Sequence, residues 1–224
     1  MACGRWRFLP IPRAAALLSA AASFFYSAYS FSRMTTKPDR LPPIPESQWT
    51  PEQKKYAQAI IDGPRGGLIS PFVPLLRSPE LMDHAQRMGE YLRYRSALTL
   101  RLSELAILVT ARFWSQPVEW AIHAPIAERA GLAAATIAAL QDGRQPADLP
   151  EDEAVVYAFS TELHHNRSVS DATWAQALRL FGEQGVVDLT GINGYYALLS
   201  MVMNGARTPV PASAAAPLRA FPDL

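Results

Sequence analysis

Apolar residues between positions 51 and 205 recur mostly three or four residues apart, which is the spacing of one face of an α-helix. The most apolar segment is LTLRLSELAILVTARFW, residues 98–114. Its regular apolar positions are Leu102, Leu105, Ala106, Val109 and Phe113, and Ile107, Leu108 and Ala111 fill most of the other side. A helix that is apolar nearly all round lies in the centre of a domain. No convincing alternation of apolar and polar residues occurs, so the pattern predicts an all-α fold.

Capping residues and prolines predict where the helices begin and end. Thr50-Pro51-Glu52-Gln53 combines an N-cap residue, a proline at the first helical position and a glutamine at the third. Pro125 lies inside one predicted helix and predicts a kink or a break there. Segment 63–76 is rich in glycine and proline but lacks the ending of a phosphate-binding loop, so we expect an ordered loop. The predicted helices cover residues 51–62, 79–94, 100–114, 117–130, 133–142, 150–164, 170–181 and 186–204, the last with Gly205 as its cap.

The sequence predicts one helical domain with additional segments at both ends. The domain covers residues 51–207, and a proline-rich segment, residues 34–50, precedes it. Residues 208–224 contain several prolines and alanines and predict a flexible tail. Residues 1–33 form a separate N-terminal extension that we exclude from the fold.

The N-terminal extension has the pattern of a targeting segment. Arg5, Arg7 and Arg13 precede the apolar run AAALLSAAASFFYSAYS, which ends in a small-residue sequence typical of signal-peptide cleavage sites. An Arg- and Ser-rich organelle transit peptide is an alternative, and so is a true start at Met34. We expect a cytoplasmic protein if Met34 is the start and an exported one if the extension is a signal peptide. The run is short for a membrane span, and we expect no stable span in the helical domain.

Composition narrows the classes of function. Apolar residues make up 49% of the 224 residues, which is enough for a sizeable core. Lysine and arginine number 21 against 20 aspartates and glutamates, without a long basic run, so nucleic-acid binding is not indicated. The single cysteine, Cys3, excludes a disulfide or a dithiol pair within one chain. We therefore expect chemistry from carboxylates, imidazoles, hydroxyls and amides, or from a borrowed cofactor.

The segment SQPVEWAIH places Glu119 and His123 four residues apart, on one side of a helix that Ser115 or Gln116 caps. Glu104 is a carboxylate on the predicted buried helix, where it needs a partner. Each has a structural interpretation as well. An acid in the first turn of a helix stabilises the helix dipole, a lone histidine is often structural, and Glu104 can pair with an arginine to join two helices.

Four segments resemble the carboxymuconolactone decarboxylase family, which shares its all-helical fold with the alkylhydroperoxidase D proteins. They are GPRGGLISPFVPLLRSPEL, GEYLRYRSALTLRLSELAILVTARFW, VEWAIHAPIAERAGL and VSDATWAQALRLFGEQGVVDLTGINGYYALLSMVMN. The resemblance covers most of residues 60–205 and implies a single domain of the alkylhydroperoxidase D type. It also implies a homo-oligomer, a trimer or a larger ring. A small-residue face at Gly191 and Gly194 would suit such close packing of helices.

The peroxidase branch of this fold has a glutamate followed by cysteines twelve and fifteen residues later and a histidine nineteen residues later. Glu104, Gln116, Glu119 and His123 stand at these offsets, so both cysteines are replaced. Peroxide reduction by a dithiol needs one thiolate to attack and a second thiol to resolve the sulfenic acid. We therefore do not expect dithiol peroxidase activity.

The decarboxylase branch implies a cofactor-free lyase that removes carbon dioxide from a carboxylated, unsaturated lactone in the breakdown of aromatic compounds. Its catalytic residues here would be Glu104, Glu119 and His123, with His123 as the acid because its ordinary pKa is about 6.5. Gln116 can donate a hydrogen bond to a substrate carbonyl, and a guanidinium can bind a carboxylate. The candidates for substrate binding are Gln116, Arg95, Arg101, Arg112 and Tyr196. We expect at most one of Tyr195 and Tyr196 to reach the pocket, because neighbouring residues point to different sides of a helix.

Two further classes stay open. A hydratase, isomerase or hydrolase could use the same acid–base residues on a small-molecule substrate. A non-catalytic oligomeric binding protein could keep the fold without the chemistry. A pocket too small for any ligand, or Glu104 held by an arginine, would favour this last class.

Overall fold

The computed structural model describes residues 38–212 and Leu218. Cys3, the N-terminal extension and most of the predicted tail lie outside these residues. The described residues form eight α-helices and one short 3-10 helix, Glu46–Gln48, and they contain no strand. The helices are α1 (Pro51–Ile61), α2 (Phe72–Leu75), α3 (Pro79–Tyr94), α4 (Leu100–Phe113), α5 (Pro117–Arg129), α6 (Ala134–Gln141), α7 (Glu151–Asn166) and α8 (Asp171–Ala206). The predicted all-α fold is confirmed.

Helix α4 forms the centre of the core. All of its residues from Leu102 to Arg112 are buried, as the apolar pattern predicts. Its N-terminus is capped by Thr99, whose side-chain oxygen accepts a hydrogen bond from the backbone N–H of Leu102. Helices α5, α6, α7 and α8 all pack against it. A polar side chain on α4 is therefore enclosed by protein on every side.

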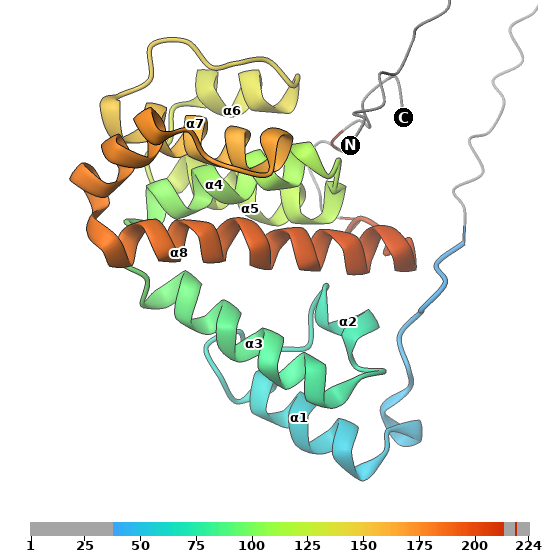
Figure 1. Cartoon of the computed structure of the whole chain (residues 1–224). Helices are drawn as coiled ribbons and strands as arrows, with labels where there is room; N and C mark the ends of the chain where they lie inside the picture. The colour runs from blue at the N-terminus through green and yellow to red at the C-terminus, as the bar shows by residue number, and fades with distance from the viewer. Residues whose placement is uncertain (1–37, 213–217, 219–224) are drawn as a thin grey trace, which may run out of the picture. The chain divides into compact units, whose positions relative to one another are not determined.

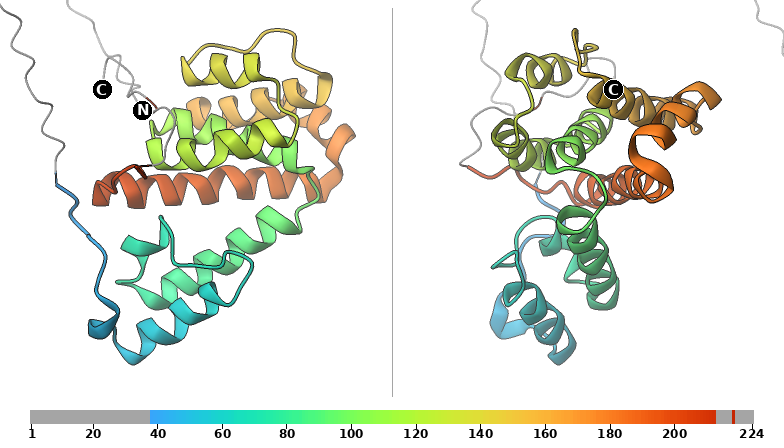
Figure 2. Two further views of the ribbon diagram at one scale, coloured as in Figure 1. Left: turned by 180° about the vertical axis from the view of Figure 1, so that it is seen from behind. Right: turned by 90° about the vertical axis from the view of Figure 1, so that its left-hand side faces the viewer.

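Helix α8 crosses the molecule and separates two groups of helices. Figures 1 and 2 show α4, α5, α6 and α7 on one side of it and α1, α2 and α3 on the other. Asp188 of α8 accepts hydrogen bonds from the Tyr91 hydroxyl, at 3.0 Å, and from the backbone N–H of Ala97, at 2.8 Å. These bonds hold the C-terminal end of α3 against α8. Side chains of α3 can therefore reach the same region as those of α5.

The predicted break within the last helical segment is confirmed. Gly182 has a φ of 67° and a ψ of 178°, which are not helical angles, so α8 consists of two helices joined at this residue. The predicted cap at its end is wrong, because the helix continues through Gly205 to Ala206. Arg207 takes the left-handed conformation there with a φ of 58°, and Thr208 N–H then donates to the carbonyl of Met203.

Two other local predictions need correction. Of the expected kink or break at Pro125, the break does not occur, because helix α5 continues through this residue. A proline there leaves only the carbonyl four residues earlier without its usual donor, and packing against α4 and α6 keeps the rest of the helix in place. The expected loop 63–76 contains the short helix α2. Its first residue, Phe72, is completely buried in the core, so burial rather than helix propensity explains this turn.

The segments before and after the helices are attached to the domain. Arg40 donates its backbone N–H to the carbonyl of Ala206 at 2.8 Å and its guanidinium to that of Gly205 at 3.1 Å. The leading segment therefore lies against the end of α8. Leu218, within the predicted flexible tail, is buried in the hydrophobic core cluster.

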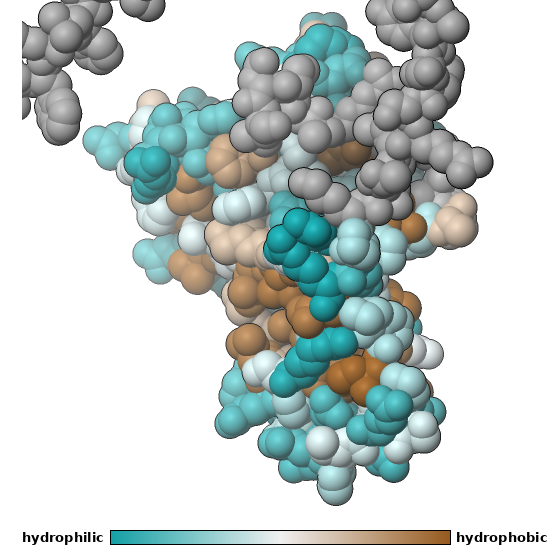
Figure 3. Space-filling model, turned by 90° about the vertical axis from the view of Figure 1, so that its right-hand side faces the viewer, coloured by the Kyte–Doolittle hydropathy of each residue, from teal (hydrophilic) through white to brown (hydrophobic). Residues whose placement is uncertain are grey.

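The small-residue face of α8 is used partly within the chain. A Cβ atom at Gly191 would lie 3.2 Å from the side chain of Leu92 on α3, whereas one at Gly194 would meet nothing within 4 Å. Figure 3 shows hydrophobic side chains gathered on the middle part of one face of the molecule. Exposed large hydrophobic residues of α8 include Val187 and Met201. Self-association stays a prediction.

Among the helices that the structure describes, α8 alone is long and apolar enough to cross a membrane. However, 56% of its most apolar window is buried inside the fold, as is usual for a core helix. Its length and composition therefore have a sufficient explanation in the packing of the domain.

Leu105→Ala should reduce the free energy of unfolding by about 2–5 kcal/mol, because it leaves a cavity in the fully buried face of α4. Leu100→Ala, in the same helix but 48% exposed, should change it by less than about 1 kcal/mol. Urea unfolding followed by circular dichroism measures both values. Equal losses in the two variants would contradict the central position of α4.

Candidate active site

Helices α4 and α5 bring Glu104, His123 and Glu119 into one row of hydrogen-bonded side chains. His123 Nδ1 lies 2.7 Å from Glu104 Oε2, and His123 Nε2 lies 3.3 Å from Glu119 Oε2. All three side chains are at least 96% buried. Glu104 has no arginine partner among the residues that the structure describes, so the alternative of a Glu104–arginine ion pair is not observed there. Glu119 and His123 face each other across one turn of α5, as their spacing predicts.

The two carboxylates determine the protonation of His123. Burial by itself lowers the pKa of this histidine, but hydrogen bonds and charge from Glu104 and Glu119 together raise it to about 9. The ring is therefore protonated at neutral pH. An imidazolium has two N–H donors, and it can donate to both carboxylates at the same time.

Two tyrosines of α8 close the row on one side. The ring of Tyr196 meets the ring of His123 edge to face, with centroids 5.0 Å apart, and the ring of Tyr195 meets that of Tyr196 at 5.2 Å. Burial raises the pKa of Tyr195 to about 12 and also raises that of Tyr196 well above its ordinary value, so both hydroxyls keep their protons. Both tyrosines line the same cavity, contrary to our expectation for neighbouring residues. Their long rings converge although their Cβ atoms point in different directions.

The cavity at this site is lined by Glu119, His123 and the two tyrosines, together with two arginines that the sequence did not point out. Arg65 comes from the loop between α1 and α2, and Arg93 comes from α3. The cavity measures about 20 Å³, which is room for about one water molecule. The site therefore combines two carboxylates, an imidazolium, two phenols and two guanidiniums around a small space.

Gly89 is the feature of the sequence that could have indicated a close contact with α3 at this site. It lies in the middle of α3, where glycine is unfavourable unless another group must come close. A Cβ atom at this position would overlap the hydroxyl of Tyr195 and lie 2.7 Å from Arg65 Nη2. The glycine leaves the space in which Arg65 and Tyr195 meet α3.

The three arginines chosen from the sequence lie elsewhere. Arg101 pairs with Asp152 at 2.6 Å and with Glu153, which ties α4 to α7. Arg95 lies at the surface, 3.9 Å from Glu90. Arg112 donates to the carbonyl of Gln141 at 3.3 Å and lines a different cavity. Their nearness to Glu104 along the chain was misleading, because none of the three lines the cavity at His123.

Gln116 also has another role. Its side-chain oxygen accepts a hydrogen bond from the backbone N–H of Val118 at 2.7 Å and so caps α5. Its amide nitrogen donates to Asn204 at 2.8 Å and connects α5 to the end of α8. It does not line the cavity at His123. The expected contact with a substrate carbonyl is therefore not supported.

Several buried polar atoms of the site are unpaired within the described part of the chain. Glu104 Oε1, Glu119 Oε1 and the Tyr195 hydroxyl make no hydrogen bond there. Buried polar atoms without partners are uncommon in folded proteins and deserve an explanation. No group of three or more histidine, cysteine, aspartate or glutamate residues in the described ranges could hold a metal ion. What the arrangement offers is proton transfer between Glu119, His123 and Glu104.

Comparison with known proteins finds a family model that matches part of these helices. Residues 79–159 match the model of the carboxymuconolactone decarboxylase family. The predicted resemblance is confirmed. The matched segment contains α3, α4 and α5, and with them Glu104, Glu119, His123 and Arg93.

A solved structure has a similar fold. It is an uncharacterized peroxidase-related protein from Silicibacter sp. TM1040, with a TM-score of 0.61 and 13% sequence identity, and the match covers 84% of this chain and 100% of that one. At this identity the likeness concerns the fold alone. No curated protein matches the chain. The family match therefore shows a similarity to the carboxymuconolactone decarboxylase family over residues 79–159, and the structural match shows a shared all-helical fold.

The imidazole of His123 should titrate near pH 9, and Glu119→Gln should lower this midpoint, because one of the two carboxylates is then lost. The folded-state pKa lies above the ordinary value. The stabilisation from this site is therefore complete below about pH 6.5 and is lost as the pH rises through about 9. NMR titration of the ring and urea unfolding across this range measure the two effects. A midpoint below neutral pH, or an equal pH dependence of stability in His123→Gln, would contradict the geometry.

Proposed function

We propose that this protein is a cofactor-free lyase that acts on a small carboxylated or lactone-containing molecule by acid–base chemistry. The observation that carries the proposal is the buried row Glu104–His123–Glu119. These residues stand at motif positions of the family. The two positions that hold cysteines in the peroxidase branch carry Gln116 and Glu119 instead.

Glu119 is the member of the row that is best placed to exchange a proton with a substrate. It lines the cavity, and its Oε1 atom makes no hydrogen bond in the described part of the chain. Its other oxygen faces His123 Nε2. Glu104 holds the opposite side of the ring through Nδ1. A proton can therefore pass between His123 and Glu119 while Glu104 keeps the ring in position.

The arginines and the tyrosine at the cavity indicate that the substrate is an anion. Arg65 and Arg93 place two positive charges at the cavity, where they attract an anion and stabilise an oxygen that becomes negative during the reaction. The Tyr195 hydroxyl keeps its proton, and its neighbour Arg65 can only donate to it, so the hydroxyl can donate a hydrogen bond to a substrate carbonyl. Such a set of groups suits a carboxylated lactone.

The proposed step breaks the carbon–carbon bond to the substrate carboxylate. Carbon dioxide leaves, and the electron pair stays on the remaining carbon and spreads into the neighbouring carbonyl. His123 passes its Nε2 proton to the Glu119 carboxylate, and Glu119 gives that proton to the carbon. His123 is then neutral, and solvent restores its proton when the product leaves. Atoms and charge balance without an added oxidant or reductant.

The small volume of the cavity sets a condition on substrate binding. A cavity of about 20 Å³ cannot hold a lactone, so side chains of the wall must move. The loop at residues 62–71 provides several of these side chains, including Arg65 and Ile69. Cβ atoms placed at Gly66 and Gly67 would meet nothing within 4 Å, so this part of the loop has room to shift. We propose that the loop shifts outward on binding, so that the substrate lies beside Glu119 and Arg65 still contacts it.

The same small volume supports a second candidate. A non-catalytic binding protein that kept the fold would need no substrate-sized cavity, and the row of charges would then only join α4 to α5. A hydratase or isomerase with the same proton chemistry is an alternative within the first proposal. Analysis of products separates these classes, because only a decarboxylase releases carbon dioxide.

His123→Gln and Glu119→Gln should each reduce turnover by at least about 100-fold, which is the usual contribution of a positioned acid or base. The assay measures carbon dioxide released from a panel of carboxylated unsaturated lactones and β-keto acids. His84→Gln, on the exposed face of α3, is the matched control and should keep full activity. Absence of carbon dioxide release across the panel would favour the non-catalytic candidate, and thiol-dependent hydroperoxide consumption would favour a peroxidase.

Arg65→Gln and Arg93→Gln should raise KM about ten-fold or more, because each removes a charged contact to an anionic substrate. Arg95→Gln should leave KM unchanged, since this exposed residue lies outside the cavity. Steady-state kinetics on the substrate found in the panel measure these values. A larger effect from Arg95 than from Arg65 would contradict the proposed binding site.

A further inference from the structure

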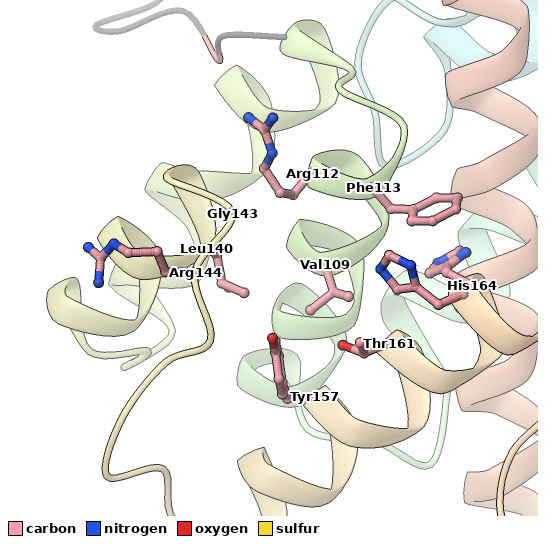
Figure 4. Close-up of a pocket in the computed structure, with 10 residues that line it drawn as sticks. Val109, Arg112, Phe113, Leu140, Gly143, Arg144, Tyr157, Thr161 and His164 are labelled. Atoms are coloured by element: carbon pink, nitrogen blue, oxygen red, sulfur yellow. The ribbon is translucent and has the colours of Figure 1, made fainter. Parts of the chain in front are cut away.

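A second cavity lies between α4, α7 and the turn that follows α6 (Figure 4). It measures about 90 Å³, which corresponds to about three water molecules. The residues that matter for its chemistry are Val109, Phe113, Leu140, Tyr157, Thr161 and His164. It shares no residue with the cavity at His123. Its function is therefore separate from the proposed lyase reaction.

A buried hydrogen-bond network holds His164 at the wall of this cavity. His164 Nε2 lies 3.0 Å from the hydroxyl of Thr110, which lies 3.1 Å from the side-chain oxygen of Asn193. The amide nitrogen of Asn193 donates in turn to Ser160 at 3.0 Å. Thr110, Asn193 and Ser160 are almost completely buried. Phe113 stacks on the imidazole with centroids 4.8 Å apart, so the ring is held in one orientation.

The network also decides which nitrogen of His164 carries the proton. The Thr110 hydroxyl has one proton and two oxygen acceptors nearby, the carbonyl of Ala106 at 2.9 Å and the side-chain oxygen of Asn193. The orientation of Asn193 is set because its nitrogen also donates to the carbonyl of Leu189. Thr110 therefore donates to an oxygen and accepts from His164 Nε2–H. Nδ1 is left with a lone pair, and no residue in the described part of the chain donates to it.

His164 is uncharged under ordinary conditions. Burial lowers the pKa of this histidine, and hydrogen bonding to Asn193 only partly opposes the effect. The ring lies in the last turn of α7, where a cation would stabilise the helix dipole. A neutral ring cannot serve that purpose. The hydrogen-bond network therefore holds a neutral imidazole at the cavity wall for another reason. Binding of a ligand to that imidazole would explain it.

The arginines at the cavity do not make it an anion site. Arg112 and Arg144 line the cavity, but Figure 4 shows their guanidinium groups pointing away from Tyr157 and Thr161. The Arg144 guanidinium lies 2.9 Å from the carboxylate of Asp142. The interior therefore offers hydrocarbon, two hydroxyls and the lone pair of a neutral imidazole. These groups favour an uncharged ligand.

We propose that this cavity binds a small uncharged hydroxyl compound, of the phenol or compact alcohol class. The ligand hydroxyl donates to His164 Nδ1, and its apolar body packs against Val109, Phe113 and Leu140. A phenol ring can enter through the open side of the cavity with its hydroxyl innermost. Thr161 and Tyr157 lie beside it and can donate to the ligand oxygen.

The test compares phenol, toluene and benzoate on the full chain by calorimetry and heteronuclear NMR. The three probes share a ring and differ in one group, so they separate a hydroxyl site from an apolar or an anion site. Phenol should bind about five-fold more tightly than toluene, which is the usual effect of one neutral hydrogen bond. It should also bind more tightly than benzoate. Equal binding of toluene, tighter binding of benzoate, or no binding of phenol would each overturn the proposal.

Variants locate the site. His164→Phe should remove the preference for phenol over toluene, whereas His84→Phe, at an exposed position of α3 outside the cavity, should keep it. Leu140→Trp fills the cavity from the opposite wall and should abolish phenol binding even if the His164 variant folds poorly. Phenol binding that survives Leu140→Trp, or a preference that survives His164→Phe, would show that the ligand binds elsewhere.

Discussion

The structure depends on how the charge of Glu104 is accommodated. This carboxylate lies on the most deeply buried helix, where an unpaired charge would cost several kcal/mol. His123 Nδ1 lies 2.7 Å from this carboxylate, and the ring is protonated because Glu104 and Glu119 face it from both sides. The bond joins α4 to α5 at one relative position, and the tyrosines of α8 then enclose it. The Glu104–His123 hydrogen bond therefore stabilises a buried charge and also brings the groups of the candidate active site together.

Two histidines in one small core show how surroundings decide chemistry. His123 lies between two carboxylates that raise its pKa, whereas burial without a carboxylate partner lowers the pKa of His164, which faces the Thr110 hydroxyl. The first ring is a cation that can supply a proton. The second is a neutral ring that can accept one hydrogen bond. Both are held by residues of α4, so one helix supports a charged site on one side and an uncharged cavity on another.

Most helices could be predicted from the sequence, because helix periodicity and capping depend on residues that are close together along the chain. The periodicity of residues 98–114 identified α4 as the central helix, and Thr50 marked the start of α1 through its side-chain cap. Gly182 interrupts α8 where the sequence predicted a break. The predictions were wrong where tertiary packing, rather than the conformational preference of the local sequence, determines the structure. Phe72 is buried within a turn expected to be a loop, and α8 continues through Gly205.

For the site, the sequence by itself determined that Glu119 and His123 share one helix face and that Glu104 stands at the offset of a known motif. Helix geometry fixes the first relation, and the order of residues along the chain fixes the second. Only the tertiary structure decided which cations belong to them. Arg95, Arg101 and Arg112 are near Glu104 along the chain but do not line the cavity at His123, whereas Arg65 and Arg93 reach the cavity through the packing of α3 on α8 beside Gly89. The direction of a long side chain depends on how whole helices pack, and no spacing within one helix encodes it.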